Sequence, residues 1–163
     1  MKLYVMRHGP AGNRGDVDDD FQRPLTSDGR KETALVARGL KRLRIGPVTL
    51  VSSPLARSRQ TAELVARELT PGEPPQIADG LASGATPGEI LRAARSHPGD
   101  VLICGHDPDF SALLSYLLTG STNPFVDFSK SGVAAIEFAA EPKRASGSLL
   151  WYLRRRQLVL LGE

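Results

Sequence analysis

Three short, almost entirely apolar stretches limit the fold of this chain more than any other feature. They are residues 2–6, 48–52 and 101–105, and each contains several aliphatic, largely β-branched side chains. Such runs are typical of strands that are buried on both faces, as in a parallel sheet covered by helices. The segments between them have helical periodicity, so the chain is predicted to form an α/β fold in which strands and helices alternate.

Helix-start signals support this alternation. Ser53 is expected to cap a helix that has Pro54 at its first position. Thr86 and Glu89 form a capping box around Pro87 at the start of another helix. The expected helices are residues 29–43, 53–70, 86 to about 97, and a segment that follows His106 and ends at Gly120.

The C-terminal part changes character. Residues 132–138 and 149–155 are rich in strand-forming side chains and flank a polar loop, which predicts an antiparallel hairpin. The arginines at 154–156 are interpreted as charges that guard an edge strand, and a nucleic-acid patch is the alternative. We therefore expect a single domain over residues 1–163, with a mostly parallel sheet, an antiparallel edge and helices on both faces.

Composition excludes several classes of protein. With 40% hydrophobic and 24% charged residues, the 163-residue chain matches a globular protein with its own core. The net charge of +3 is read as ordinary solubilising charge, so no nucleic-acid partner is expected. The single cysteine, Cys104, has no zinc-site spacing, and no metal or cofactor is expected. No signal-peptide core or membrane span is recognised, which predicts a cytoplasmic protein without a membrane partner.

Polar side chains follow the predicted strands at the point where each strand ends. Arg7 and His8 follow the first strand, Arg57 lies just after the second, and His106 follows the third. Ligands of α/β sheets bind outside the carboxyl ends of the strands, so these side chains are expected to gather there. Arginine matches phosphate oxygens, and a neutral histidine can attack phosphorus. This set, without a carboxylate cluster for a metal, predicts metal-free phosphoryl transfer.

The same residues resemble the histidine phosphatase superfamily, also called the phosphoglycerate mutase-like family. Its signatures are Arg-His-Gly after the first strand, here residues 7–9, and Ser-Pro-Leu-x-Arg-x-x-Gln-Thr-Ala, here residues 53–62. A Pro-Leu-Thr-x-x-Gly segment at 24–29 and a later histidine, His106, complete the resemblance. The short length and the Gly-His-Asp-Pro segment at 105–108 are similar to the SixA group of phosphohistidine phosphatases.

The resemblance implies a phosphoenzyme mechanism. His8 would attack phosphorus and carry the phosphoryl group, which water then removes. Arg7, Arg57 and His106 would bind the phosphoryl oxygens. Further substrate contacts are expected from Gly9, Asn13, Arg14, Asp107 and Ser131.

One departure from the larger family bears on the substrate. Many members carry an acidic residue where this chain has Ala82 and Ser83. An alkoxide leaving group needs a proton from such an acid, whereas imidazole, with a pKa of about 6.5, leaves without it. The absence favours a phosphohistidine substrate on a protein partner, although Asp79, Glu89 and Asp107 remain possible acids.

Two other functions remain as hypotheses, and the acidic loop has two interpretations. A phosphatase for small phosphomonoesters and a non-catalytic module that binds phosphorylated proteins are the competing hypotheses. The acidic run at residues 15–22 is interpreted as a solvated loop, with a flap that repels other anions or recognises a basic partner as the alternative.

Overall fold

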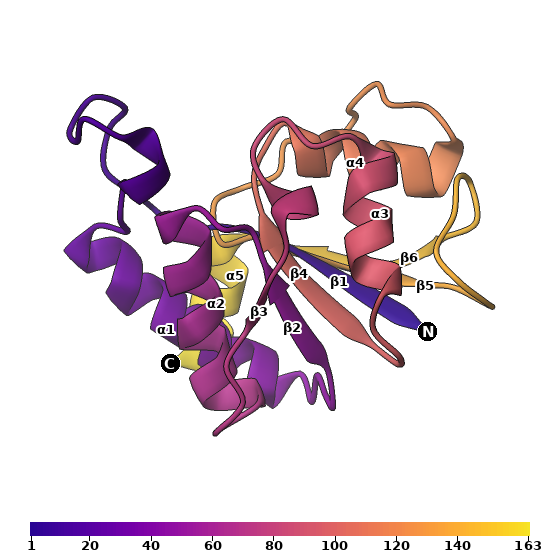
Figure 1. The fold of residues 1–163 in the computed structure, drawn as a ribbon. Coiled ribbons are helices and arrows are strands. Elements are labelled where there is room, and N and C mark those ends of the chain that lie inside the picture. The colour runs from indigo at the N-terminus through magenta and orange to yellow at the C-terminus, as the bar shows by residue number, and fades with distance from the viewer.

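A six-stranded sheet forms the centre of the computed structural model, which describes residues 1–163 (Figure 1). The sheet has the order β3-β2-β4-β1-β5-β6, and only β5 runs against the other strands. The expected mostly parallel sheet with an antiparallel edge is therefore confirmed. The strands are β1 (Lys2–Arg7), β2 (Thr49–Ser52), β3 (Gln76–Ile77), β4 (Val101–Gly105), β5 (Val133–Glu137) and β6 (Ser148–Leu153).

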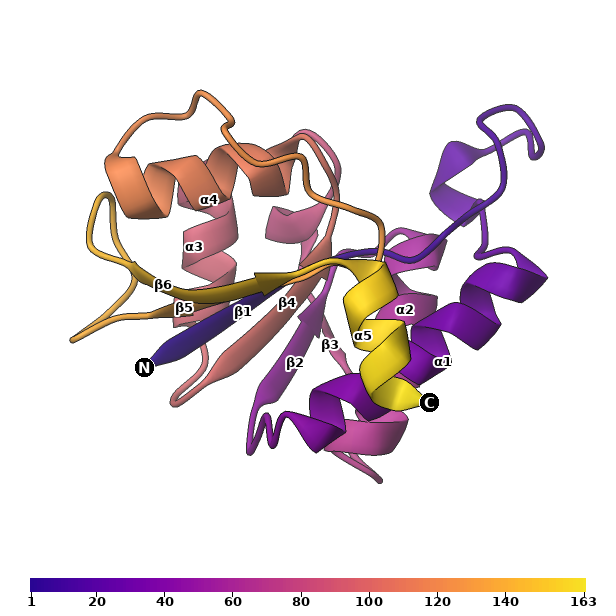
Figure 2. The same cartoon turned by 180° about the vertical axis from the view of Figure 1, so that it is seen from behind.

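Helices cover both faces of this sheet, as predicted (Figures 1 and 2). One face carries α1 (Ser27–Arg42), α2 (Ala56–Leu69) and α5 (Arg155–Gly162), and the other carries α3 (Pro87–Arg95) and α4 (Asp109–Thr119). None of the helices is long and apolar enough to cross a membrane. Two single turns of 3-10 helix, η1 (Asp20–Gln22) and η2 (Asp79–Leu81), lie in the connections.

Two separate hydrophobic cores explain why the strands are apolar throughout. Leu3 and Val5 of β1 enter the core beneath α3 and α4, whereas Tyr4 and Met6 enter the core beneath α1, α2 and α5. Successive side chains of a strand point to opposite faces, so a strand between two helical layers needs apolar residues at every position. The strand pattern in the sequence thus reflects the layered architecture directly.

The helix starts agree with the sequence in one case and differ in another. The capping box of α3 forms as expected, with Thr86 and Glu89 bonded in both directions. The second helix begins at Ala56 and not at Ser53, so that prediction was wrong. The Ser53 hydroxyl accepts from the N–H of Leu55, which precedes the helix, and lies 2.8 Å from Nε2 of His106.

The C-terminal hairpin is confirmed, but the chain does not end as a strand. β6 stops at Leu153, and the arginine run opens α5, which the sequence did not predict. α5 lies along α1 and places Leu158 in the core shared with α2 (Figure 2). Gly39 and Gly162 permit this close approach, because a Cβ atom on either would collide with a backbone carbonyl of the other helix. The interpretation of the run as an edge-strand guard was therefore wrong.

Candidate active site

The register between β1 and β4 brings two histidines together. Arg7 is paired with Gly105 across the two parallel strands, and His8 and His106 are the next residues of each. The backbone N–H of His8 donates to the carbonyl of Gly105 at 2.9 Å, and the two ring centroids are 5.3 Å apart. Arg57 reaches the same edge from the first turn of α2. The four side chains thus gather at the carboxyl ends of the strands.

His8 is buried, and its backbone neighbour determines which ring nitrogen carries the proton. Nδ1 lies 2.8 Å from the carbonyl oxygen of Gly9, which can only accept a hydrogen bond. The proton is therefore on Nδ1, and Nε2 has a free lone pair. Burial, joined by the positive charges of Arg57 and Arg7, lowers the pKa of His8 to about 3. The ring is neutral at neutral pH.

His106 is oriented by two serines. Its Nε2 lies 2.8 Å from the Ser53 hydroxyl and 3.4 Å from the Ser58 hydroxyl. Since Ser53 Oγ also accepts from the N–H of Leu55, its own proton can point at Nε2. That arrangement leaves the ring proton on Nδ1, which is buried without a partner. Burial, followed by the charge of Arg57, lowers the pKa of His106 to about 4.

Both arginines also carry unpartnered N–H groups. Nη1 of Arg7 donates to the carbonyl of Phe128 at 2.5 Å, and Nη1 of Arg57 donates to the carbonyl of Asp20 at 3.0 Å. The Nε atom of each arginine is buried and has no partner. Three of the five buried side-chain N or O atoms without a partner therefore belong to Arg7, Arg57 and His106. Unpaired buried donors are costly, and an anion with several oxygen atoms would satisfy them.

The second sequence motif holds the site together. Oγ1 of Thr61 accepts from the N–H of Gly9 at 2.9 Å and donates to the carbonyl of Arg57 at 2.7 Å. The side-chain oxygen of Gln60 accepts from the N–H of Leu25 at 2.9 Å. The serines, the glutamine and the threonine of this motif each tie a neighbouring segment to α2. These hydrogen bonds fix the position of the helix turn that carries Arg57.

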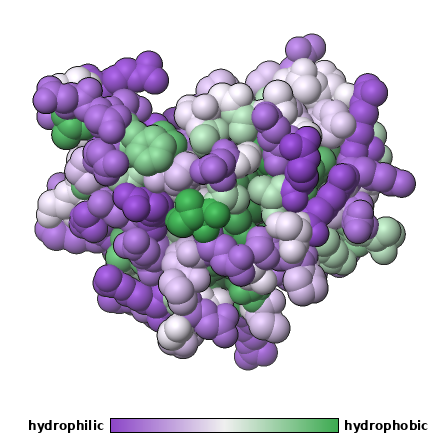
Figure 3. All heavy atoms as spheres, viewed as in Figure 1, coloured by the Kyte–Doolittle hydropathy of each residue, from purple (hydrophilic) through white to green (hydrophobic).

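The loop between β1 and α1 contributes a residue that the sequence reading placed in solvent. This loop projects from the sheet edge and forms a mostly hydrophilic lobe (Figures 1 and 3). Its Asp20 carboxylate lies 3.3 Å from Nη2 of Arg57 and 2.7 Å from Nε of Arg23. The hydrogen bond from Arg23 is the largest cause that lowers the pKa of Asp20. The acidic run is thus not wholly solvated, because one member pairs with a site arginine.

Arg23 is a site residue that sequence reasoning missed. It shares the Asp20 carboxylate with Arg57, and its positive charge contributes to the lowered pKa values of Arg57 and His106. Its Nη1 donates to the carbonyl of Gly12 at 2.6 Å. The available signal was its position directly before the Pro-Leu-Thr motif.

Two of the predicted substrate contacts, Asp107 and Ser131, form hydrogen bonds within the protein. Asp107 accepts from the N–H and hydroxyl of Ser111, at 3.1 and 2.5 Å, and so caps the first turn of α4. Ser131 is fully buried, and its N–H donates to the carbonyls of Arg7 and His8, each at 3.1 Å. Both groups help to hold the site, and their contact with the substrate stays a prediction.

The other predicted contacts lie closer to expectation. Gly9 is buried beside His8, where a Cβ atom would collide with the Thr33 hydroxyl. Asn13 and Arg14 are exposed residues of the projecting loop, and Arg14 is near enough to Asp20 to lower its pKa. Contact of Asn13 and Arg14 with the substrate stays a prediction.

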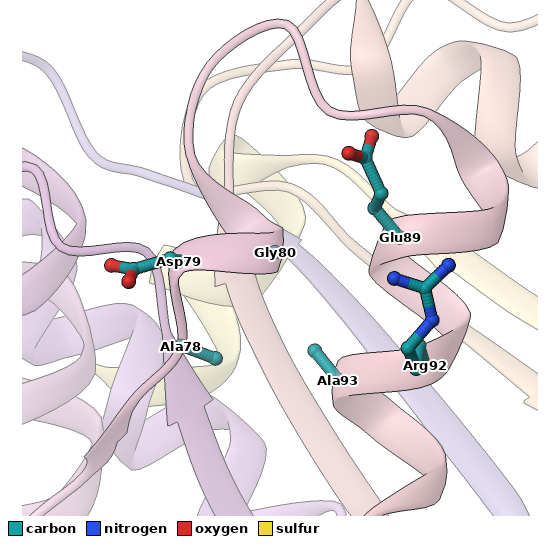
Figure 4. Close-up of a pocket in the computed structure, with 6 residues that line it drawn as sticks. All are labelled: Ala78, Asp79, Gly80, Glu89, Arg92 and Ala93. Carbon is teal, nitrogen blue, oxygen red and sulfur yellow. The ribbon is translucent and has the colours of Figure 1, made fainter.

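Two carboxylates considered as proton donors, Glu89 and Asp79, lie at the start of α3 and in η2. Glu89 accepts from the N–H and hydroxyl of Thr86, at 2.8 and 2.7 Å, and these bonds lower its pKa. Asp79 lies across a hollow of about 450 Å³ and points away from Glu89 (Figure 4). No group of three or more His, Cys, Asp or Glu side chains is placed to hold a metal ion. The site is dominated by donors to an anion.

Comparison with known proteins identifies the family. The family model of the histidine phosphatase superfamily (branch 1) matches residues 3–83. An uncharacterised protein of Picosynechococcus is 36% identical over 145 residues, which cover 86% of this chain and 87% of that protein. The chain belongs to the histidine phosphatase superfamily. It is accordingly a phosphatase.

Two further comparisons relate the chain to one group of this superfamily. The phosphohistidine phosphatase SixA of Escherichia coli is 27% identical over 157 residues, which cover 94% of this chain and 93% of that protein. A structure of the protein histidine phosphatase SixA complexed with tungstate has a TM-score of 0.81 and 25% identity, covering 97% of this chain and 99% of that one. The resemblance to SixA drawn from the motifs is therefore confirmed over almost the whole chain.

Proposed function

We propose that this chain is a metal-independent phosphatase that removes the phosphoryl group from phosphohistidine on a protein, through a covalent intermediate on His8. The observation that carries the proposal is the pairing of a neutral, buried His8 with three buried, unpartnered N–H donors beside it. These are Nε of Arg7, Nε of Arg57 and Nδ1 of His106. A nucleophile next to a cluster of anion donors suits attack on a phosphoryl group.

In the first step, Nε2 of His8 uses its free lone pair to attack phosphorus in line with the departing nitrogen. A nitrogen–phosphorus bond forms on His8 as the one on the substrate breaks, and the substrate ring, which carries a proton on its other nitrogen, leaves as neutral imidazole. Arg7, Arg57 and Nδ1–H of His106 bind the phosphoryl oxygens throughout. Water then attacks phosphorus, His8 recovers its lone pair, and inorganic phosphate is released.

The carboxylates support a nitrogen leaving group. Glu89 is bonded to the start of its own helix, and Asp20 is paired with Arg23, so the pKa of each is lowered and each is ionised at neutral pH. Neither is suited to protonate an alkoxide. An imidazole with a pKa of about 6.5 requires no such acid. The similarity to SixA, named as a phosphohistidine phosphatase, supports the same substrate class.

The test compares kcat/KM for a protein bearing phosphohistidine with that for a small phosphate monoester, in buffer containing EDTA. A purified His8→Ala variant gives the background rate. We expect strong preference for the phosphohistidine protein and no loss of activity with the chelator. Preference for the monoester would assign the chain to small-molecule phosphatases, and a strict requirement for a divalent ion would contradict the metal-independent mechanism.

A further inference from the structure

A cationic hollow lies between the segment before β5 and the start of α5, and none of the four site residues lines it. It has a volume of about 320 Å³, and no hydrophobic side chain lines it. We call it the basic hollow. Its lining residues are Ser129, Lys130, Arg154, Arg155 and Arg156.

A chain segment that lines the basic hollow is also bonded to the active site. The segment from Phe128 to Ser131 begins at the carbonyl that accepts from Arg7 and ends at the N–H that donates to the carbonyl of His8. Lys130 lies within this segment. Burial lowers the pKa of Lys130, and so do the nearby charges of Arg7, Arg23 and Arg155. Lys130 therefore lines the hollow and belongs to the segment that is bonded to Arg7 and His8.

The positive charge of the hollow is only partly neutralised. Arg155 pairs with Glu32 at 3.2 Å, and Arg154 approaches Asp127 at 4.0 Å. Lys130 and Arg156 take part in no ion pair within the molecule. Four cations therefore face two carboxylates, which leaves a local excess of positive charge.

The position of the arginine run is unfavourable for the fold itself. Arg155 and Arg156 occupy the first turn of α5, where the helix dipole favours negative charge. The first turns of α1 and α3 contain Asp28 and Glu89, as the dipole favours. Helix stability therefore does not account for the run, and an external anion at this point would offset the repulsion.

We propose that the basic hollow binds carboxylate side chains of the protein that presents its phosphohistidine to His8. This inference rests on the proposed function. A phosphohistidine at His8 remains attached to its polypeptide, whose neighbouring residues must cross the surface next to the site. The absence of apolar lining favours an acidic segment over an apolar one, and the absence of aromatic lining disfavours stacked nucleotide bases.

The experiment uses two phosphohistidine peptides of the same sequence, one with Glu at the flanking positions and one with Gln. The readout is the ratio of their kcat/KM values, acidic over neutral. For the wild-type chain we expect a ratio of about five to ten, as two or three exposed charge pairs would give, and a decrease with added salt. In a Lys130→Gln, Arg156→Gln double variant the ratio should fall to about two or less.

A matched double variant, Arg38→Gln with Arg67→Gln, controls for the loss of two positive charges. Both residues are exposed, lie on α1 and α2, and form no ion pair within the molecule. This control should keep the wild-type ratio, and phosphoramidate, a small donor without flanking residues, should be hydrolysed equally by all the proteins. If the Lys130/Arg156 variant lost as much kcat/KM with phosphoramidate as with the acidic peptide, the two residues would act on catalysis and not on docking. That result would overturn the inference.

The remaining outcomes separate the two proposals. Hydrolysis of both peptides at equal rates by the wild-type chain would overturn the docking role and leave the proposed function standing. Hydrolysis of neither peptide, with phosphomonoesters still cleaved, would overturn the proposed function and the docking role with it. Stronger inhibition by a single-stranded oligonucleotide than by an oligo-glutamate of equal charge would overturn the assignment of an acidic polypeptide.

Discussion

The strand-end edge and the start of α3 hold their polar groups in opposite ways. On the strand-end side, His8 and His106 are buried, and each has one ring nitrogen fixed by a neighbouring backbone or hydroxyl group. On the side of α3, the exposed Glu89 is bonded to the cap of its own helix. The first arrangement prepares donors and a nucleophile, whereas the second keeps a carboxylate ionised and occupied. We infer that the chain is organised to hold a phosphoryl group and not to protonate a leaving group.

Removing His8, the proposed nucleophile, should have the largest effect. His8→Ala is expected to lower kcat/KM by at least about a thousandfold and to abolish the labelled phosphoenzyme, because no other side chain replaces its lone pair. The measurement is rapid denaturation at alkaline pH after mixing with a radiolabelled donor. His97→Ala, at the far end of α3, is the matched control. Retained phosphoenzyme in the His8 variant would mean that another group carries the phosphoryl.

Removing one donor from the strand-end side should have the next largest effect. Arg57→Ala is expected to lower kcat by about a hundredfold, as for the loss of one preorganised group that stabilises transition-state charge. Steady-state kinetics measure this, with the exposed Arg67 of the same helix changed to Ala for comparison. If Arg57→Ala stayed within a few-fold of the wild type, its pairing with Asp20 would be purely structural.

The burial of the two histidines should make the protein sensitive to acid. Burial lowers the pKa of His8 to about 3 and of His106 to about 4, whereas unfolded histidine has a pKa of about 6.5. Below pH 6.5 the unfolded chain therefore binds more protons, and the free energy of unfolding falls as pH falls toward 4. Each histidine contributes a slope of up to about 1.4 kcal/mol per pH unit.

Denaturant unfolding between pH 7 and pH 4.5 measures this slope. His106→Asn should reduce it, because the variant has one less proton to bind on unfolding. An unaltered slope in His106→Asn would show that His106 takes up its proton in the folded state.

Supplying the missing acid should have the smallest effect and would sharpen the contrast between the two sides. Ser83→Glu places a carboxyl group in the loop before α3, which adjoins the start of α4 through the bond from Gly84 N–H to Asp109. We expect kcat/KM for a phosphomonoester to rise about threefold to tenfold, well below the gain from an optimally placed acid. Ser83→Gln is the control. An equal rise in both variants would show that proton donation is not the cause.

The sheet and the gathering of strand-end residues could be predicted because both follow from local patterns. A strand such as β4 is apolar at every position since it lies between two helical layers, and this is visible in the sequence alone. The assembly of His8, Arg57 and His106 follows from the rule that parallel strands deliver their carboxyl ends to one edge. Their geometry matches the expectation, while their catalytic roles stay predictions.

The features that the sequence did not reveal depend on distant partners. Ser53 has every local property of a helix cap, but His106 lies closer to its hydroxyl than any helical N–H does. α5 is a short helix whose stability comes from packing against α1, a contact that no local pattern encodes. The ion pair between Asp20 and Arg57 likewise joins a loop to a helix that is distant in the sequence. The pattern of charges along the chain does not predict which residues pair over such a separation.

The pairing of β1 with β4 determines when during folding the candidate site is assembled. His8, the proposed nucleophile, is near the start of the chain, but its neighbour His106 follows a strand in the second half, and Arg7 is anchored by a residue later still, Phe128. The site is therefore assembled only when these distant segments dock in register, since a one-residue slip would turn each side chain to the opposite face. A nascent or truncated chain that lacks β4 has no phosphoryl-binding centre, so activity appears only when folding is nearly complete.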